Sequence, residues 1–213
     1  MKKITFLLVF ISIFGYAQTP ITDANIQTAV DLWISDPSTA TTTYGNISDW
    51  DVSQVTDMLD LFYNAPSFNQ DISAWDVSSV TNMGTMFFRS ELFNQDIGGW
   101  DVSSVLDMNN MFVSAQSFNQ DIGAWDVSSV LDMERMFYLA SSFNQDIGAW
   151  CVTNFVSEPP TFSLDSPLSE SNKPIWGTCP TASIEDQYLT NISIYPNPTN
   201  NTLFISGNET PIT

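Results

Sequence analysis

A tryptophan recurs every 25 residues through the middle of the chain, with no insertion between copies. Five of the seven tryptophans form this series, namely Trp50, Trp75, Trp100, Trp125 and Trp150. The tetrapeptide FNQD keeps the same period and begins at Phe68, Phe93, Phe118 and Phe143. A unit this small cannot bury its own apolar face, so it must stack on its neighbours. The period therefore predicts a solenoid of stacked coils over residues 49–150.

The segment after each tryptophan has apolar residues at helical spacing. In the second unit these are Val80, Met83, Met86, Phe87 and, on the same face, Ser90. This stripe predicts a helix of about two to three turns in each coil. Serine and aspartate at capping-box spacing mark its start in two later copies, at Ser104 with Asp107 and at Ser129 with Asp132. The return segment, such as residues 95–97, has room only for a short strand, which would pair between coils as a narrow parallel sheet.

The chain is strongly acidic and contains no histidine. It has 5 basic and 24 acidic residues, for a net charge of −19. Nucleic acid is excluded as a partner, because binding phosphates needs clustered lysine and arginine. Without histidine, Ser-His-Asp, Cys-His and histidine-zinc sites are excluded as well. Paired carboxylates are the only catalytic equipment left.

Residues 1–17 have the pattern of a signal peptide. Two lysines precede an apolar run over residues 4–14, and small residues follow at Gly15 and Ala17. The run is shorter than the roughly 20 residues that a bilayer-spanning helix needs. We therefore expect cleavage after Ala17 and an exported mature chain with no membrane-spanning segment. Its only basic residues would be Arg89, Arg135 and Lys173.

Both ends of an open stack need caps, because the end coils would otherwise expose apolar faces. In residues 18–48, a stripe at i, i+3, i+4 and i+7 predicts an amphipathic helix that begins at Thr22 or Asp23. The stripe consists of Ile26, Ala29, Val30 and Trp33. We expect a threonine-rich loop between this helix and the first repeat.

The string WCVTNF, which begins at Trp150, starts another copy of the repeat. Residues 151–180 break this copy and end in WGTCP. Cys151 and Cys179 are the only cysteines. In an exported chain they are expected to form a disulfide that closes the C-terminal cap. The alternative is a pair of reactive thiols or metal ligands, for which two cysteines without histidine make a poor site.

Aspartates recur in two columns of the repeat. One follows the tryptophan, as Asp51, Asp76, Asp101 and Asp126, and the other ends FNQD, as Asp71, Asp96, Asp121 and Asp146. One interpretation is that each carboxylate accepts backbone N–H bonds in its own turn, beside an inward polar ladder of the FNQD asparagines. The other is that Ca²⁺ lies between coils, with the FNQD aspartates as ligands. No other cofactor is predicted.

Positions that differ between copies are candidates for binding. One such column consists of Tyr63, Phe88, Val113 and Tyr138. On the predicted helix it lies roughly 130° from the buried stripe, at about 100° per residue. Outward-facing aromatics dominate binding hot spots, so this column is the candidate binding face. The alternative is that these side chains only cover the neighbouring coil.

The repeat WDVSSVTNMxxMFxxAxxFNQDIGAW resembles that of the BspA-family bacterial surface proteins, which are divergent relatives of leucine-rich repeat proteins. The resemblance runs from about Gly45 to Trp150, and the flanking segments ITDANIQTAVDLW and WCVTNF…WGTCP also resemble that family's. It implies leucine-rich-repeat-like coils and a secreted or surface protein that acts by contact. The expected fold class is thus an α/β solenoid, each coil holding a short strand and a short helix, with an N-terminal helical cap and a disulfide-closed C-terminal cap.

The tail has a second resemblance. Residues 181–213 contain LTNISIYPNPTNNTLFISG, which is similar to the opening of the type A sorting domain of type IX secretion. The matching residues are the core from Tyr195 to Pro198 and the strand from Thr202 to Ile205. The resemblance implies contact with the secretion machinery and an association with the outer membrane. An ordinary β-hairpin is the alternative.

These observations favour a non-enzymatic exported protein whose outer face binds an extracellular protein or polysaccharide. A rigid surface spacer without a ligand is one alternative. An Asp-based glycan-active enzyme is another, although the repeated aspartates offer no singular pair.

Overall fold

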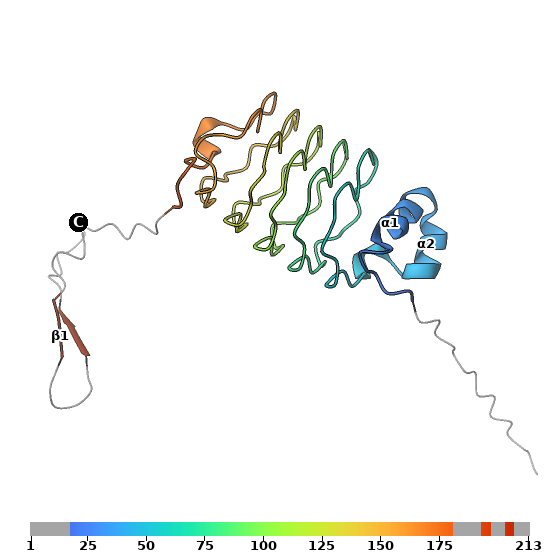
Figure 1. The fold of residues 1–213 in the computed structure, drawn as a ribbon, viewed down its shortest axis with the longest axis horizontal. Helices are drawn as coiled ribbons and strands as arrows, with labels where there is room; N and C mark the ends of the chain where they lie inside the picture. The colour runs from blue at the N-terminus through green and yellow to red at the C-terminus, as the bar shows by residue number, and fades with distance from the viewer. Residues whose placement is uncertain (1–17, 181–192, 197–202, 207–213) are drawn as a thin grey trace, which may run out of the picture. The chain divides into compact units, whose positions relative to one another are not determined.

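The computed structural model describes residues 18–180 and two short segments, 193–196 and 203–206. The chain divides into two compact units, Met1–Cys179 and Pro180–Thr213. In the first unit, two α-helices cover one end of a row of coils, and a short 3-10 helix lies at the other end (Figure 1). The predicted signal peptide, residues 1–17, lies outside the described residues.

The N-terminal cap begins with helix α1, Ile26–Ser35, which starts after the expected position. Its buried side chains belong to the predicted stripe and are Ile26, Ala29 and Val30. Asp23 does not cap this helix. Its carboxylate instead accepts hydrogen bonds from the backbone N–H of Thr56 at 2.7 Å and the Thr56 hydroxyl at 2.8 Å. Asp23 therefore fastens the cap to the first coil.

The segment expected as a threonine-rich loop is helix α2, Pro37–Tyr44. The Asp36 carboxylate caps it by accepting from the Thr39 N–H at 3.1 Å, and Pro37 suits the first turn because it has no N–H to satisfy. Threonine hydroxyls inside the helix donate to carbonyls four residues earlier, at Thr41, Thr42 and Thr43. A 3-10 helix, η1, spans Ile47–Asp49 and leads into the first coil.

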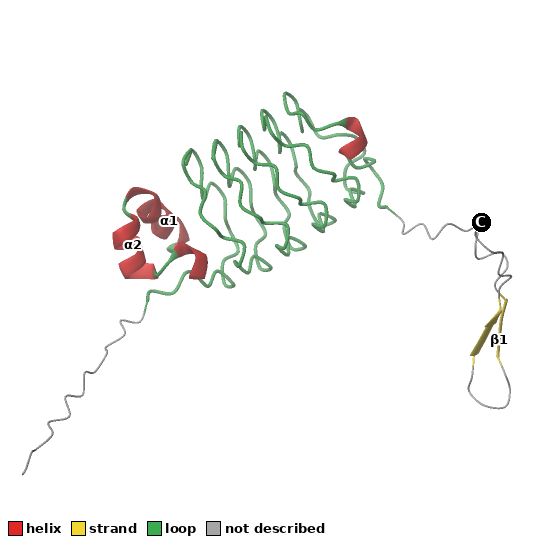
Figure 2. Ribbon diagram, turned by 180° about the vertical axis from the view of Figure 1, so that it is seen from behind, coloured by secondary structure: helices red, strands yellow, loops and turns green. Residues whose placement is uncertain are grey.

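The coils contain neither the predicted helix nor the predicted strand, so the expected α/β leucine-rich-repeat fold is wrong. From residue 50 to residue 150 the backbone consists of turns and irregular segments (Figure 2). The strand-like pairing between coils is limited to isolated parallel bridges, which join Asp57 to Asn82, Asn82 to Asp107, and Asp107 to Asp132. The aspartates expected to cap helices thus lie where neighbouring coils pair.

Alternate N–H groups bond in different directions, which is why no helix forms. In the second coil, Met86 donates to Met83 and Ser90 donates to Phe87, each closing a four-residue turn. Within these turns, the N–H groups of Thr85 and Arg89 donate to carbonyls of the next coil, at Asn109 and Val113. The third residue of each turn is left-handed, with φ of 53° at Thr85 and 56° at Arg89. Residues 83, 86, 87 and 90 are therefore the first and last residues of two successive turns, and their spacing is the same as that of a helical face.

The sheet expected near residues 95–97 is replaced by a side-chain ladder. The backbone N–H of Asn94 donates to Asn69 Oδ1 at 2.9 Å, and Gln95 Nε2 donates to the Asn69 carbonyl at 3.1 Å. The same contacts recur in the next two coils. The asparagine ladder is thus present, but it is not inward, because Asn69 is exposed. Asparagine amides take the place of backbone partners here, and this prevents a regular sheet.

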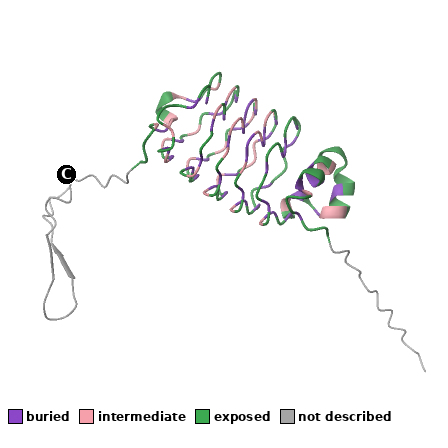
Figure 3. Cartoon of the chain, viewed as in Figure 1, coloured by how far each residue is buried: buried purple, intermediate pink, exposed green. Residues whose placement is uncertain are grey.

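The interior is a set of stacked aromatic columns. Phe62, Phe87, Phe112 and Phe137 are each fully buried, with successive ring centroids 5.4 to 5.6 Å apart. The repeated tryptophans are also buried. From Trp75 on, their indole N–H groups donate to carbonyls 28 residues earlier, as in Trp100 to Ile72 at 3.2 Å, whereas Trp50 donates to Gly45. Buried positions alternate with exposed ones along every coil (Figure 3). The coils are thus held together by a continuous core.

The chain completes one more coil after Trp150. The N–H of Phe137 donates to Phe162 and that of Leu139 to Leu164, so the C-terminal cap repeats the turn of the earlier coils. The buried ring of Phe162 packs edge-on against Phe137 with centroids 5.4 Å apart, and Trp176 packs edge-on against Phe162 at 5.1 Å. The 3-10 helix η2, Glu170–Asn172, lies in this segment.

The second unit contains a two-stranded antiparallel hairpin. Strand β1, Ser193–Pro196, pairs with strand β2, Leu203–Ser206. The strand expected at residues 202–205 is therefore displaced by one residue. The hairpin fits both interpretations of the tail.

Candidate functional site

The FNQD aspartates each hold their own turn. Asp71 accepts from the Ser73 N–H at 3.0 Å and from the Ser73 hydroxyl at 2.7 Å. The other three accept a backbone N–H two residues on, Asp96 from Gly98, Asp121 from Gly123 and Asp146 from Gly148. The column after the tryptophans does the same with Ser53, Ser78, Ser103 and Ser128. These contacts agree with the turn interpretation of both columns.

Hydrogen bonds from serine keep several of these aspartates acidic. The Ser103 hydroxyl, followed by the Ser103 N–H, holds the pKa of Asp101 below its ordinary value. The pKa values of Asp51, Asp71 and Asp126 are lowered for the same reason. A glycan hydrolase needs one carboxyl with a raised pKa as general acid. The shifts at these four aspartates go in the opposite direction.

Residues 18–180 contain no group of three or more aspartate, glutamate or cysteine side chains placed to hold a metal ion. Calcium at Asp71, Asp96, Asp121 and Asp146 stays a prediction. The predicted disulfide is confirmed, since Cys151 is bonded to Cys179 across a separation of 28 residues.

The predicted binding column, Tyr63, Phe88, Val113 and Tyr138, lies at the outer side of the turns. Tyr63 is exposed to 50%, whereas Phe88 and Tyr138 are less exposed and only partly buried. The rings of Tyr63 and Phe88 stack with centroids 4.9 Å apart and planes 13° apart. Val113 does not face outward as predicted, because only 4% of it is exposed. We call these four residues the outer column.

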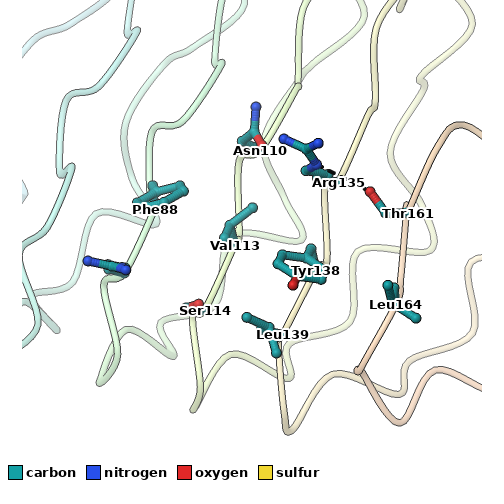
Figure 4. A pocket seen from close by; sticks show the side chains of 10 residues that line it. Phe88, Asn110, Val113, Ser114, Arg135, Tyr138, Leu139, Thr161 and Leu164 are labelled. Carbon is teal, nitrogen blue, oxygen red and sulfur yellow. Dashed lines mark hydrogen bonds between the residues drawn. The ribbon is translucent and has the colours of Figure 1, made fainter.

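A groove of about 350 Å³ opens at Val113. Val113 lies between Phe88 and Tyr138, with Asn110 and Arg135 on one side and Ser114 on the other (Figure 4). Each neighbouring coil has an aromatic ring in the outer column, and the third coil has only the small valine. The missing ring thus opens the groove at Val113, and the groove continues past Tyr138 to Thr161 and Leu164 of the C-terminal cap.

Two columns of left-handed residues flank the outer column. The first consists of Asp60, Thr85, Asn110, Arg135 and Thr161, and the second of Asn64, Arg89, Ser114, Leu139 and Asp165. The groove is bordered by six of these ten residues, Arg89, Asn110, Ser114, Arg135, Leu139 and Thr161. Because their turns are tied to a neighbouring coil by backbone hydrogen bonds, both rims are fixed in position.

The groove holds two of the five basic residues of the whole sequence. Arg89 and Arg135 both line it, and no acidic residue is among its lining residues. The Arg89 guanidinium carbon lies 5.6 Å from the centroid of the Phe88 ring. Arg135 donates from Nε to the Thr161 hydroxyl at 3.3 Å and lies 3.4 Å from a carboxylate oxygen of Glu134. In a strongly acidic chain, this is a local positive site.

Sequence reasoning missed the arginines and the contribution of the C-terminal cap. Thr161 and Leu164 line the groove, although they belong to the segment in which the repeat breaks down. Two signals were present in the sequence. Arg89 and Arg135 are the only basic residues between residues 4 and 172, and Val113 is the only non-aromatic member of the outer column.

A family model described as "Mycoplasma protein of unknown function, DUF285" matches the chain at residues 35–150 and 76–170. These matches cover the coils and most of the C-terminal cap. No curated protein and no solved structure matches the chain.

Proposed function

The chain belongs to the DUF285 family, and we propose that it is an exported, non-enzymatic binding protein. It holds an extracellular protein or polysaccharide at or near the cell surface, through the outer column and the groove at Val113. It needs no cofactor for this task.

The groove carries the proposal. A volume of about 350 Å³ is within the range of ligand-binding clefts, and its lining combines apolar side chains with a few polar and charged ones. Elsewhere on the coils, the same turn-forming aspartates and asparagines recur in each copy. The groove lies where the third copy differs from the others, at Val113. Such a singular position is the best place on the coils for a specific contact.

The export part of the proposal rests on the sequence. Residues 1–17 have the signal-peptide pattern, and the tail resembles a type IX sorting domain. The β1–β2 hairpin is compatible with that resemblance. None of the described helices is long and apolar enough to cross a membrane. On this proposal the secretion machinery recognises the tail, and the coils act outside the cell or at its outer membrane.

The experiment is a retention assay with the purified full chain on immobilised matrix proteins and polysaccharides, scored for both retention and cleavage. We expect retention without cleavage on at least one material, and its loss in Val113→Tyr, which fills the groove. Tyrosine occupies the same position in two other coils, so this variant is expected to fold. Cleavage of a polysaccharide would establish the enzyme instead. Failure to be retained on any material would support the spacer.

A further inference from the structure

We infer that the groove at Val113 takes an aromatic side chain of a partner protein, flanked in that partner by carboxylates. This inference rests on the proposed function and names the class of partner. It follows from three properties of the groove: its shape, its apolar floor and its charge.

The shape fits one planar ring. The outer column stacks aromatic rings coil on coil, with Tyr63 and Phe88 4.9 Å apart. Phe88 and Tyr138 belong to coils two apart, which places them roughly 10 Å from each other at about 4.8 Å per coil. A ring inserted over Val113 would continue the stack between them. Offset stacking of this kind stabilises aromatic pairs beyond the area they bury.

The floor is apolar. Val113 is 4% exposed, and the exposed leucines Leu139 and Leu164 line the same groove. A sugar ring inserted edge-on would bring hydroxyls onto Val113, Leu139 and Leu164, whose side chains offer them no hydrogen-bond partner. An aromatic edge loses nothing there. The floor therefore favours an aromatic side chain over a sugar.

The positive charge of the groove determines which residues of the partner can flank the inserted ring. Among the described residues, Arg89 has no carboxylate within ion-pair distance, and its guanidinium makes no hydrogen bond. Arg135 still has donors beyond the bonds to Thr161 and Glu134, because a guanidinium carries five N–H groups. Arginine binds carboxylates through paired N–H groups. The two arginines would therefore attract acidic side chains to the inserted ring.

The positions of the two arginines determine the spacing expected between the acidic residues of the partner. Arg89 is in the second left-handed column and Arg135 in the first, so they occupy opposite rims, two coils apart. An extended peptide advances about 3.3 Å per residue, so two coils correspond to roughly three residues. Acidic residues on both sides of one aromatic residue thus match both rims.

The test uses the full chain and the capped probe peptide Gly-Asp-Glu-Tyr-Glu-Asp-Gly, titrated by isothermal calorimetry in low salt. Two control peptides replace the tyrosine with alanine or the four acids with their neutral amides, asparagine and glutamine, because a lysine peptide would be attracted to the acidic chain as a whole. We expect the probe to bind and both controls to bind at least about tenfold more weakly, because ring and charges act together. Arg89→Ala and Arg135→Ala should each weaken binding by about two- to fivefold, as exposed ion pairs do.

Val113→Tyr should abolish binding of the probe peptide, with an unchanged melting temperature. Its matched control is Leu92→Tyr, which adds the same ring at an exposed site that does not line the groove, and which should bind like wild type. Equal binding by Val113→Tyr and wild type would overturn the inference. Oligogalacturonate that binds instead of the peptide, and that Val113→Tyr blocks, would overturn the aromatic occupant but support the proposed function. If neither the peptide nor oligogalacturonate binds, but a protein of the retention panel does, this inference alone is overturned. If neither probe binds and no material of the panel retains the chain, the proposed function is overturned too.

Discussion

The ring of Phe88 stacks on the ring of Tyr63, one coil before it, with centroids 4.9 Å and planes 13° apart. The next position in this column is Val113, where the stack stops. In a repeat protein, one changed side chain alters a surface that is otherwise uniform. Val113 opens the groove in this way, and Thr161 and Leu164 of the C-terminal cap complete its lining.

Left-handed residues that are neither glycine nor asparagine carry a conformational cost. Leu139 has φ of 58° and is 39% exposed. Asparagine tolerates this region and occupies the same column at position 64. Leu139→Asn should therefore raise the free energy of unfolding by about 1 kcal/mol, as measured by urea denaturation.

The matched control is Leu106→Asn, at a similarly exposed leucine that is not left-handed. Leu106→Asn should not raise the free energy of unfolding. Equal effects of the two substitutions would show that backbone strain is not the cause.

The disulfide closes the C-terminal cap. Because Cys151 and Cys179 are 28 residues apart, removing the cross-link should lower the free energy of unfolding by about 3 to 4 kcal/mol. The double variant Cys151→Ser with Cys179→Ser should therefore unfold at a lower urea concentration than wild type. The same shift should appear in wild type with reductant. An effect of reductant on the double variant would point to a cause other than this bond.

Acid should destabilise the coils. The Ser103 hydroxyl and N–H hold the pKa of Asp101 below its ordinary value of 3.8 in the folded state. A carboxyl with a lowered folded pKa contributes stability that is present above the unfolded pKa and is lost as the pH falls through the folded pKa. The melting temperature should thus drop as the pH falls below about 4. Repulsion by Asp126 is the smallest of the effects on Asp101, so relief of that repulsion should not reverse the drop.

Nuclear magnetic resonance titration of the Asp101 carboxyl tests the cause. Its pKa should lie below 3.8 in wild type and should rise in Ser103→Ala. If the pKa is the same in both proteins, the serine hydrogen bonds do not account for it.

Metal removal distinguishes the two interpretations of the FNQD aspartates. Since Asp96, Asp121 and Asp146 each accept an N–H within their own turn, EDTA should leave the melting temperature unchanged. A decrease that Ca²⁺ restores, and that Asp121→Asn removes, would instead place calcium between the coils.

The stacking of the coils was predictable because the tryptophan period requires neighbours to share a core, and each tryptophan is indeed buried. The conformation within a coil was not. Met83, Met86 and Phe87 are buried at helical spacing, but two successive four-residue turns bury the same positions. Only the backbone hydrogen bonds between coils distinguish a helix from two successive turns, and the sequence of one repeat does not show these bonds.

The candidate site was predictable in part, for a related reason. Variation between copies identified the outer column, yet its orientation was derived from a helix that does not form. Val113 was therefore assigned to the surface, whereas it lies at the floor of a groove. The rims depend on left-handed turns at Arg89 and Arg135, residue types that give no local signal for that conformation.

The most direct test of the central claim is the methyl spectrum of Val113 during titration with the probe peptide or with a protein retained on the panel. The Val113 methyl signals are expected to shift and saturate, with contacts to an aromatic ring of the partner. The methyl signals of Val102 and Val127, which are buried in coils 3 and 4 outside the groove, should stay unchanged. Binding that leaves the Val113 signals in place would contradict the claim that this groove is the binding site.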